Sequence, residues 1–379
     1  MIGPMKQGVL IALASVCAIG TARAQMPAAA ATKPAPALPV LKIAVSEDDD
    51  YQTLPWSGQP GEYQESYCNG NGDVYVVRGG SGLVALSAKG VIPFLADKIT
   101  DVPHPRTTSL GMNPSLSASG ISFLATGTDD SKVETRNWTD DQGQKHVDHD
   151  LSTAILHYLV RFDADGTYRG AIKLDLPFLV YKFATFDSGA VIAQGMEKEK
   201  IPRIALLNAS AEFMRYLDLP KDISTAGSTS PDDVKCNGCT ADMNSVVFNT
   251  YFTPWRNEIL LKREFGNGLR IYEIQESGQV RLTKVNVPEG YDIGPMVPSD
   301  RNWLVRFNKP DAGGVRPRAF DSLLEIDPQN GKPLREYHLK PPATVPETIL
   351  SCFFDGEFWG IRQNQKEGRI EVVRGAAAP

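Results

Sequence analysis

One short stretch, HVDHD, combines two imidazoles with two carboxylates, side chains that could bind a metal ion. Its four candidate ligands are His146, Asp148, His149 and Asp150. Imidazole together with carboxylate suits zinc, copper, iron or nickel, and in a loop the two histidines could converge on one ion. The surrounding residues 129–150 hold seven acidic and three basic side chains. A solvated acidic loop is therefore the alternative interpretation.

A second stretch, KCNGCT, holds the cysteines Cys236 and Cys239 around Asn237-Gly238. Such a pair could bind a metal, exchange disulfides, attach a haem or form a local disulfide. Thr240 stands where a haem-attachment motif needs histidine, and a thioredoxin-like site needs a helix that follows a strand in a βαβ unit. A zinc site needs two further ligands, which the histidines of HVDHD could supply. We predict a Cys236–Cys239 disulfide, with a shared zinc site as the open alternative.

The start of the chain has the three parts of a secretory signal peptide. Lys6 supplies a positive charge, residues 8–20 form a short apolar core, and Ala22 and Ala24 precede a cleavage site before Gln25. The apolar core is shorter than the ~20 residues needed to span a bilayer. We therefore predict an exported protein, periplasmic or extracellular, without a transmembrane segment once the signal has been removed.

The predicted domain organisation follows from this signal. It comprises a signal peptide over 1–24, an Ala/Pro-rich linker over 25–38 and one folded domain over 39–379. The chain holds five cysteines, and removal of Cys17 with the signal leaves four. An even number of cysteines in an oxidising compartment favours disulfides over free thiols.

The composition is that of a globular protein with a mildly acidic surface. Hydrophobic residues make up 42% of the 379 residues, and the formal net charge is −6. No cluster of Lys and Arg forms a stripe, so the sequence argues against a nucleic-acid partner. Neither a GxSxG nor an HExxH motif occurs, so the common hydrolase signatures are missing.

A repeated unit of short apolar strands and polar turns organises the domain. Residues 72–95 show it as GDVYVV, GLVALSAKG and VIPFL, and a further strand precedes each unit. The turns SAKG, DADG, ESGQ and DPQNG recur between the same two strands, where Asp, Asn and Gly favour tight hairpins. The other units lie at 120–176, 189–219, 257–287, 302–339 and 356–374.

Six units of four strands predict an all-β fold, a six-bladed β-propeller. The last unit lacks its fourth strand, and the segment PVLKIAVS at 39–46 is a spare strand at the other end of the chain. We predict that this N-terminal strand closes the last blade as its outer edge, which also removes an exposed sheet edge. A seven-bladed ring or a pair of β-sandwiches is the alternative.

In its DADG-type turns and strand order the sequence resembles the six-bladed propellers, the broad group of NHL-repeat, TolB-like and gluconolactonase-like proteins. The resemblance covers residues 39–375 and is architectural, without a catalytic motif. It implies, as the alternative function, a metal-dependent hydrolase or lactonase with a divalent metal in the central channel. Channel asparagines could contribute to such a site, or they could form turns; the candidates are Asn69, Asn71, Asn113, Asn244 and Asn249.

The strand order also predicts which loops share a face. Connections between blades, and between second and third strands, emerge on one face, and all four long insertions fall there: 47–60, 127–154, 220–244 and 308–320. We call this the insertion-rich face and predict that the protein binds a small-molecule or protein ligand through it.

Cys68 and Cys352 occupy equivalent innermost-strand positions of the first and last units. A disulfide needs Cα atoms within about 7 Å, and neighbouring inner strands may lie further apart. We therefore expect two buried free thiols, with a bridge across the ring closure as the alternative.

Overall fold

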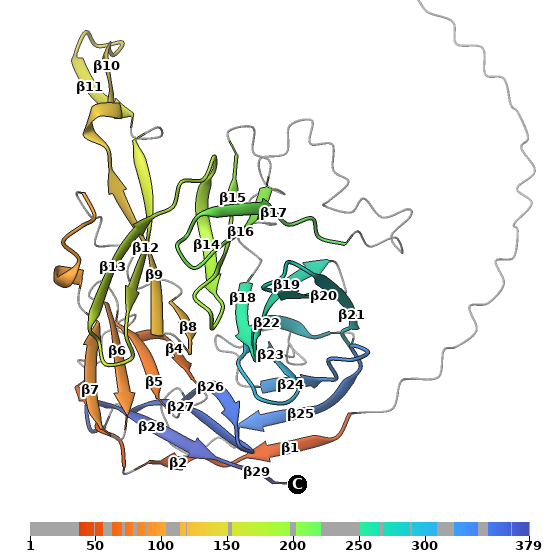
Figure 1. The fold of residues 1–379 in the computed structure, drawn as a ribbon. Coiled ribbons are helices and arrows are strands. Elements are labelled where there is room, and N and C mark those ends of the chain that lie inside the picture. Colours follow the sequence, from red (N-terminus) through yellow and green to blue (C-terminus); the bar gives the residue numbers. More distant parts are fainter. Residues whose placement is uncertain are drawn as a thin grey trace, which may run out of the picture. The chain divides into compact units, whose positions relative to one another are not determined.

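The computed structural model describes most of residues 38–378 as strands joined by short turns (Figure 1). The segments outside this description are 1–37, 49, 56–62, 70–72, 79–81, 88, 95, 104–113, 119, 151–153, 198–201, 221–250, 266–267, 289, 309–321, 340–347, 365 and 379. The predicted signal peptide and nearly all of the predicted linker therefore lie outside the described residues. No helix in the described part of the chain has the length and hydrophobicity needed to cross a bilayer.

The first four blades are antiparallel sheets of four strands, each with its strands in chain order. Blade one contains β4 (Tyr63–Cys68), β5 (Val74–Arg78), β6 (Gly82–Ser87) and β7 (Gly90–Phe94). Blade two contains β8 (Ser115–Ser117), β9 (Gly120–Thr128), β12 (Ile155–Phe162) and β13 (Tyr168–Lys173). Blade three contains β14 (Leu179–Thr185), β15 (Val191–Met196), β16 (Pro202–Leu207) and β17 (Phe213–Tyr216). Blade four contains β18 (Tyr251–Trp255), β19 (Glu258–Phe265), β20 (Gly268–Gln275) and β21 (Val280–Asn286).

The last two blades also take in strands from the two ends of the domain. Blade five contains β22 (Asp292–Val297), β23 (Trp303–Asn308), β24 (Ser322–Ile326) and β25 (Pro333–Leu339), extended by β1 (Val40–Ile43) and β29 (Ala377–Ala378). Blade six contains β26 (Thr348–Phe354), β27 (Glu357–Asn364) and β28 (Arg369–Gly375), completed by β2 (Ser46–Glu47) and β3 (Leu54–Pro55). In the described residues, short 3-10 helices lie in connections at Ala96–Lys98 and Asp130–Lys132.

A separate hairpin extends from blade two. Its strands are β10 (Glu134–Thr139) and β11 (Lys145–Asp150), which form a two-stranded sheet of their own. Figure 1 shows this hairpin in yellow, reaching beyond the ends of β9 and β12. All six residues of β10 are exposed, so neighbouring blades contribute little to the stability of the hairpin.

Burial between adjacent blades holds the ring together. Each of the six apolar clusters contains residues from two neighbouring blades, and together the clusters cover all six blade–blade junctions. Blades one and two, for example, meet through Phe94, Phe123 and Phe162, whose rings pack edge to face or tilted. The predicted six-bladed β-propeller is therefore confirmed, and a seven-bladed ring or two sandwiches is not observed.

The N-terminal segment closes the ring, as predicted, but its residues are divided between blades five and six. Only Ser46–Glu47 and the later Leu54–Pro55 pair with β28 as the outer edge of blade six. Val40–Ile43 instead pairs in parallel with β25 of blade five, and β29 covers its other edge. Both ends of the domain are thus hydrogen-bonded into sheets, which leaves fewer exposed strand edges.

The junction of the first and last blades also carries a disulfide, between Cys68 on β4 and Cys352 on β26. Our expectation of free thiols was wrong, because the two innermost strands converge until their Cα atoms are 5.9 Å apart. The hydroxyls of Ser66 and Ser351, on the same two strands, are hydrogen-bonded at 2.5 Å. The bridge links residues 284 positions apart and fastens the ring at its closure.

A buried charge cluster supports the same closure in blade six. Glu371 is fully buried and accepts hydrogen bonds from Arg362 at 2.7 Å, Arg369 at 2.9 Å and Asn364 at 2.6 Å. Arg369 also reaches Glu47 on β2 at 3.0 Å. Burial by itself would raise the pKa of Glu371, but these hydrogen bonds and charges outweigh it, so the pKa lies below its usual value.

Candidate functional site

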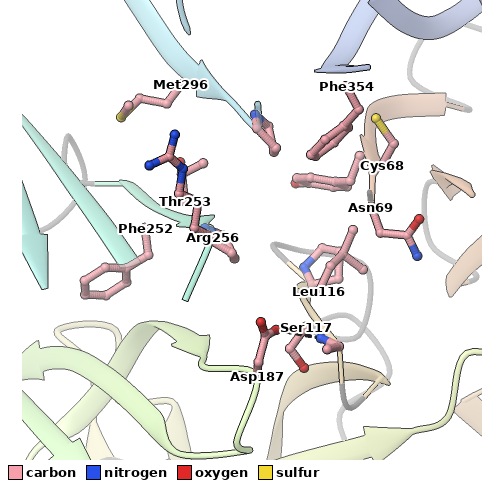
Figure 2. A pocket seen from close by; sticks show the side chains of 15 residues that line it. Cys68, Asn69, Leu116, Ser117, Asp187, Phe252, Thr253, Arg256, Met296 and Phe354 are labelled. Atoms are coloured by element: carbon pink, nitrogen blue, oxygen red, sulfur yellow. Dashed lines mark hydrogen bonds between the residues drawn. The ribbon is translucent and has the colours of Figure 1, made fainter. Parts of the chain in front are cut away.

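A cavity of about 310 Å³ lies where the innermost strands end and turn into the second strands (Figure 2). We call it the axial cavity, because every one of the six blades contributes residues from its innermost strand or from the turn that follows. The lining residues are Tyr67, Cys68, Asn69, Pro114, Leu116, Ser117, Ala118, Asp187, Phe252, Thr253, Pro254, Arg256, Met296, Pro298 and Phe354. Its walls are thus set by the whole ring and not by one mobile loop.

The walls of the axial cavity are largely apolar. Phe252, Met296 and Phe354 come from blades four, five and six, and Leu116 from blade two. Pro254 lies within an innermost strand, which is the edge of its blade and therefore tolerates a residue without an N–H. Such walls suit an apolar ligand body, and a few polar groups would fix its orientation.

Asp187 supplies a carboxylate to this cavity. It follows β14 in the turn to β15, is exposed, and accepts a hydrogen bond from the backbone N–H of Ala118 at 2.7 Å. This bond ties the turns of blades two and three together. Figure 2 shows Asp187 on the wall beside Ser117.

Arg256 supplies the positive charge, and its backbone is unusual. It begins the two-residue turn between β18 and β19, where Trp255 pairs with Glu258, and its φ is 54°. The corresponding turn of blade six contains Asp355 at φ 53° followed by Gly356. Asp, Asn and Gly are the usual residues for this left-handed conformation, whereas an arginine adopts it at an energetic cost.

The guanidinium of Arg256 is held by weak contacts. Its central carbon lies 4.3 Å from the centre of the Trp255 ring. One nitrogen donates to the backbone carbonyls of Asp300, at 3.4 Å, and Arg301, at 3.3 Å. Within the described residues, no carboxylate forms an ion pair with Arg256. The charge is therefore held in place by these contacts without being neutralised by a carboxylate among the described residues.

Asn69 was a candidate for metal ligation in the channel, and it does line the axial cavity. Its side chain is used in the turn between β4 and β5, however. The carbonyl accepts from the backbone N–H of Asp73 at 3.1 Å, and the amide donates to Asp73 and to Tyr75, both at 3.2 Å. Turn formation, the alternative role, accounts for Asn69. The other asparagine candidates lie outside the described residues.

A second cavity, of about 430 Å³, opens between blades four and five, and Trp255 and Arg256 line it as well. Some of its charged groups have partners within the same sheet. Arg281 binds Glu273 at 2.6 Å, and Gln275 donates to Glu258 at 3.0 Å. Burial and the adjacent Glu273 raise the pKa of Glu258. Arg256 thus separates a mainly apolar cavity on the axis from a polar one outside it.

The predicted metal ligands lie on β11 and line neither cavity. His146 bonds Asp140 at 2.8 Å and stacks on Trp138, and the indole N–H of Trp138 donates to Asp148 at 2.6 Å. In a strand, alternate residues face opposite sides, so His149 lies on the other side from these residues, near Thr135.

No group of three or more His, Cys, Asp or Glu among the described residues could hold a metal ion. The metal site at His146, Asp148, His149 and Asp150 stays a prediction, although β11 places His149 on the opposite face from His146 and Asp148. The predicted Cys236–Cys239 disulfide lies within 221–250, outside the described residues, and also stays a prediction.

The sequence reasoning missed the axial cavity, because it directed attention to the insertion-rich face. The cavity lies at the opposite end of the channel, at the turns between first and second strands. One signal was present: in PWRNE, residues 254–258, an arginine stands in a two-residue turn where FFDGE, residues 353–357, has aspartate. A side chain that fits its local backbone poorly often marks a functional position.

Comparisons with known proteins add little to this description. No protein-family model matches the chain, and no curated protein matches it. Similar solved structures include a protein of unknown function from Dyadobacter fermentans, with 11% identity, a TM-score of 0.41, and 87% of this chain and 99% of that chain covered.

Two further solved structures are a luciferin-regenerating enzyme and the WD40 domain of Neurospora crassa Pan2. The first has 7% identity and a TM-score of 0.38 over 88% of this chain and 95% of that chain. The second has 8% identity and a TM-score of 0.38 over 86% and 95%. At these values the similarities carry no argument about function, and the six-bladed architecture rests on the strand order described above.

Proposed function

We propose that this protein is a binding protein whose ligand occupies the axial cavity. The observation that carries the proposal is the cavity's position on the ring axis, with walls from all six blades. Its volume of about 310 Å³ suits a small ligand. Apolar walls with one carboxylate, Asp187, and one guanidinium, Arg256, would bind an amphipathic molecule in a fixed orientation.

We further propose that the protein acts outside the cytoplasm. The Cys68–Cys352 disulfide supports this, since such bridges persist in oxidising compartments. The signal-like segment at 1–24 points the same way.

The lactonase alternative is not favoured. In the part of the chain that the structure describes, the candidate channel residue Asn69 is engaged in a turn, and the axial cavity contains one acidic residue, Asp187. A divalent metal in a channel site of that kind would need several oxygen ligands.

The insertion-rich face supports a second candidate function, binding of a protein partner. The β10–β11 hairpin exposes 47% of Trp138 and 58% of Val147, one on each side of the strand pair. With seven acidic and three basic residues over 129–150, it would suit a partner with a basic surface. Loss of a captured partner in W138A, but not in S210A at an exposed turn of blade three, would support this second function.

A thermal-shift screen with a panel of small metabolites tests the first function. A ligand specific for the folded state raises the melting temperature. We expect at least one compound to stabilise the wild type but not S117W, whose indole would fill the cavity. The control is S210W, which alters an exposed turn in blade three. Equal shifts in S117W and wild type, or no shift for any compound, would contradict the proposal.

A further inference from the structure

We infer that the ligand of the axial cavity is an amphipathic monocarboxylate, with its acid group on Arg256 and its apolar body against the phenyl rings of Phe252 and Phe354. This inference rests on the proposed function and specifies the class of ligand. It starts from Arg256, which lines the cavity and forms no ion pair among the described residues.

The left-handed backbone conformation of Arg256 supports a role in ligand binding. A residue at φ 54° in a two-residue turn is commonly Asn, Asp or Gly. Among the described residues the arginine forms no salt bridge in return, and its contacts there are a ring face and two long hydrogen bonds. An unfavourable conformation that no salt bridge compensates indicates a role in binding a ligand.

The contacts that hold the guanidinium of Arg256 also support a role in ligand binding. Trp255 is 94% buried, so the indole beneath Arg256 is a fixed platform. Stacking on this platform and donation to the carbonyls of Asp300 and Arg301 use only part of the planar donor set. The remaining donors can bind a carboxylate in the bidentate geometry that guanidinium favours.

The other residues that line the axial cavity indicate which net charge and which apolar group the ligand carries. Phe252, Leu116, Met296 and Phe354 form apolar walls, which suit a hydrocarbon or aromatic body. Among the described lining residues Asp187 is the one acid, and its charge would repel a ligand with two negative charges, such as a phosphate monoester. One cation and one anion in the lining therefore match a single carboxylate better than a dianion.

Calorimetric titration with three probes of one shape, phenylpropionate, phenylpropanol and phenylpropylamine, tests the inference on the full-length chain. We expect phenylpropionate to bind the wild type at least about tenfold more tightly than phenylpropanol, as charge-assisted hydrogen bonds imply. Arg256 repels the amine and Asp187 attracts it, so the amine should bind more weakly than the acid. R256Q should remove the advantage of the acid, whereas R169Q, at an exposed arginine of blade two outside the axial lining, should leave it unchanged.

The outcomes separate the two proposals. If phenylpropanol or phenylpropylamine binds as tightly as phenylpropionate, or R256Q binds the acid as the wild type does, the inference is wrong. The proposed function would survive that result if S117W still abolished binding of those probes. No detectable binding of phenylpropionate overturns the inference, and the broader metabolite screen then decides the proposed function independently.

Discussion

Cys68 and Cys352 join the innermost strands of the first and last blades, with their Cα atoms 5.9 Å apart. The bridge adds a covalent link at the ring closure, where β2 and β3 join blade six only by pairing with β28. Cys68 also lines the axial cavity. Ring closure and cavity shape therefore depend on the same residue.

Replacing both cysteines in C68A/C352A should lower the free energy of unfolding by about 2–4 kcal/mol, the usual effect of losing a structural disulfide. Urea unfolding of the variant and of the wild type, with and without reductant, measures this difference. Reductant should destabilise the wild type and leave the variant unchanged. A variant as stable as the oxidised wild type would show that the bridge contributes nothing to closure.

His157 should make the protein sensitive to acid. Neither ring nitrogen has a hydrogen-bond partner among the described residues, and burial lowers the pKa of His157 to about 4. The unfolded chain, with an ordinary value of 6.5, binds a proton first as the pH falls. Above pH 6.5 His157 is neutral in both states and does not lower the free energy of unfolding. As the pH falls towards 4, the free energy of unfolding decreases by about 3 kcal/mol in all.

The variant H157F keeps a ring of similar shape without a titrating group. Above the ordinary histidine pKa, the unfolding free energies of wild type and H157F should change with pH by the same amount. As the pH falls from that value to 4, the wild type should lose more stability than H157F. If both proteins lose the same stability over this range, His157 does not carry the acid sensitivity.

Arg256 should be dispensable for folding. In R256N, relief of the left-handed backbone of arginine, about 1 kcal/mol, offsets the lost stacking on Trp255, about 0.5–1 kcal/mol. We expect the free energy of unfolding to stay within about 0.5 kcal/mol of the wild type. The alternative variant R256V, with a β-branched residue in the same conformation, should be clearly less stable. A large loss of stability in R256N would mean that the arginine is structural.

Local patterns in the sequence predicted most of the fold, because each blade repeats the same strands and turns. The DADG turn, for instance, joins β12 and β13 with Gly166 at φ 77°, as such turns require. The division of the N-terminal segment between two blades was not predictable from its apolar pattern. Val40–Ile43 could have paired with either outer strand, and tertiary contacts decide which.

The candidate site was harder to predict than the fold. The axial cavity is formed by residues from six blades, and these come together only when the ring closes. Likewise, the Cys68–Cys352 bridge depends on how closely two inner strands approach, which sequence equivalence alone does not determine. Long insertions are visible in a sequence, whereas a cavity built from short turns is not.

The most direct test of the account is a crystal structure of the protein with phenylpropionate bound at a saturating concentration. The account predicts ligand density in the axial cavity, with the carboxylate against Arg256 and the phenyl ring between Phe252 and Phe354. Density at the insertion-rich face, with the axial cavity filled only by solvent, would contradict it.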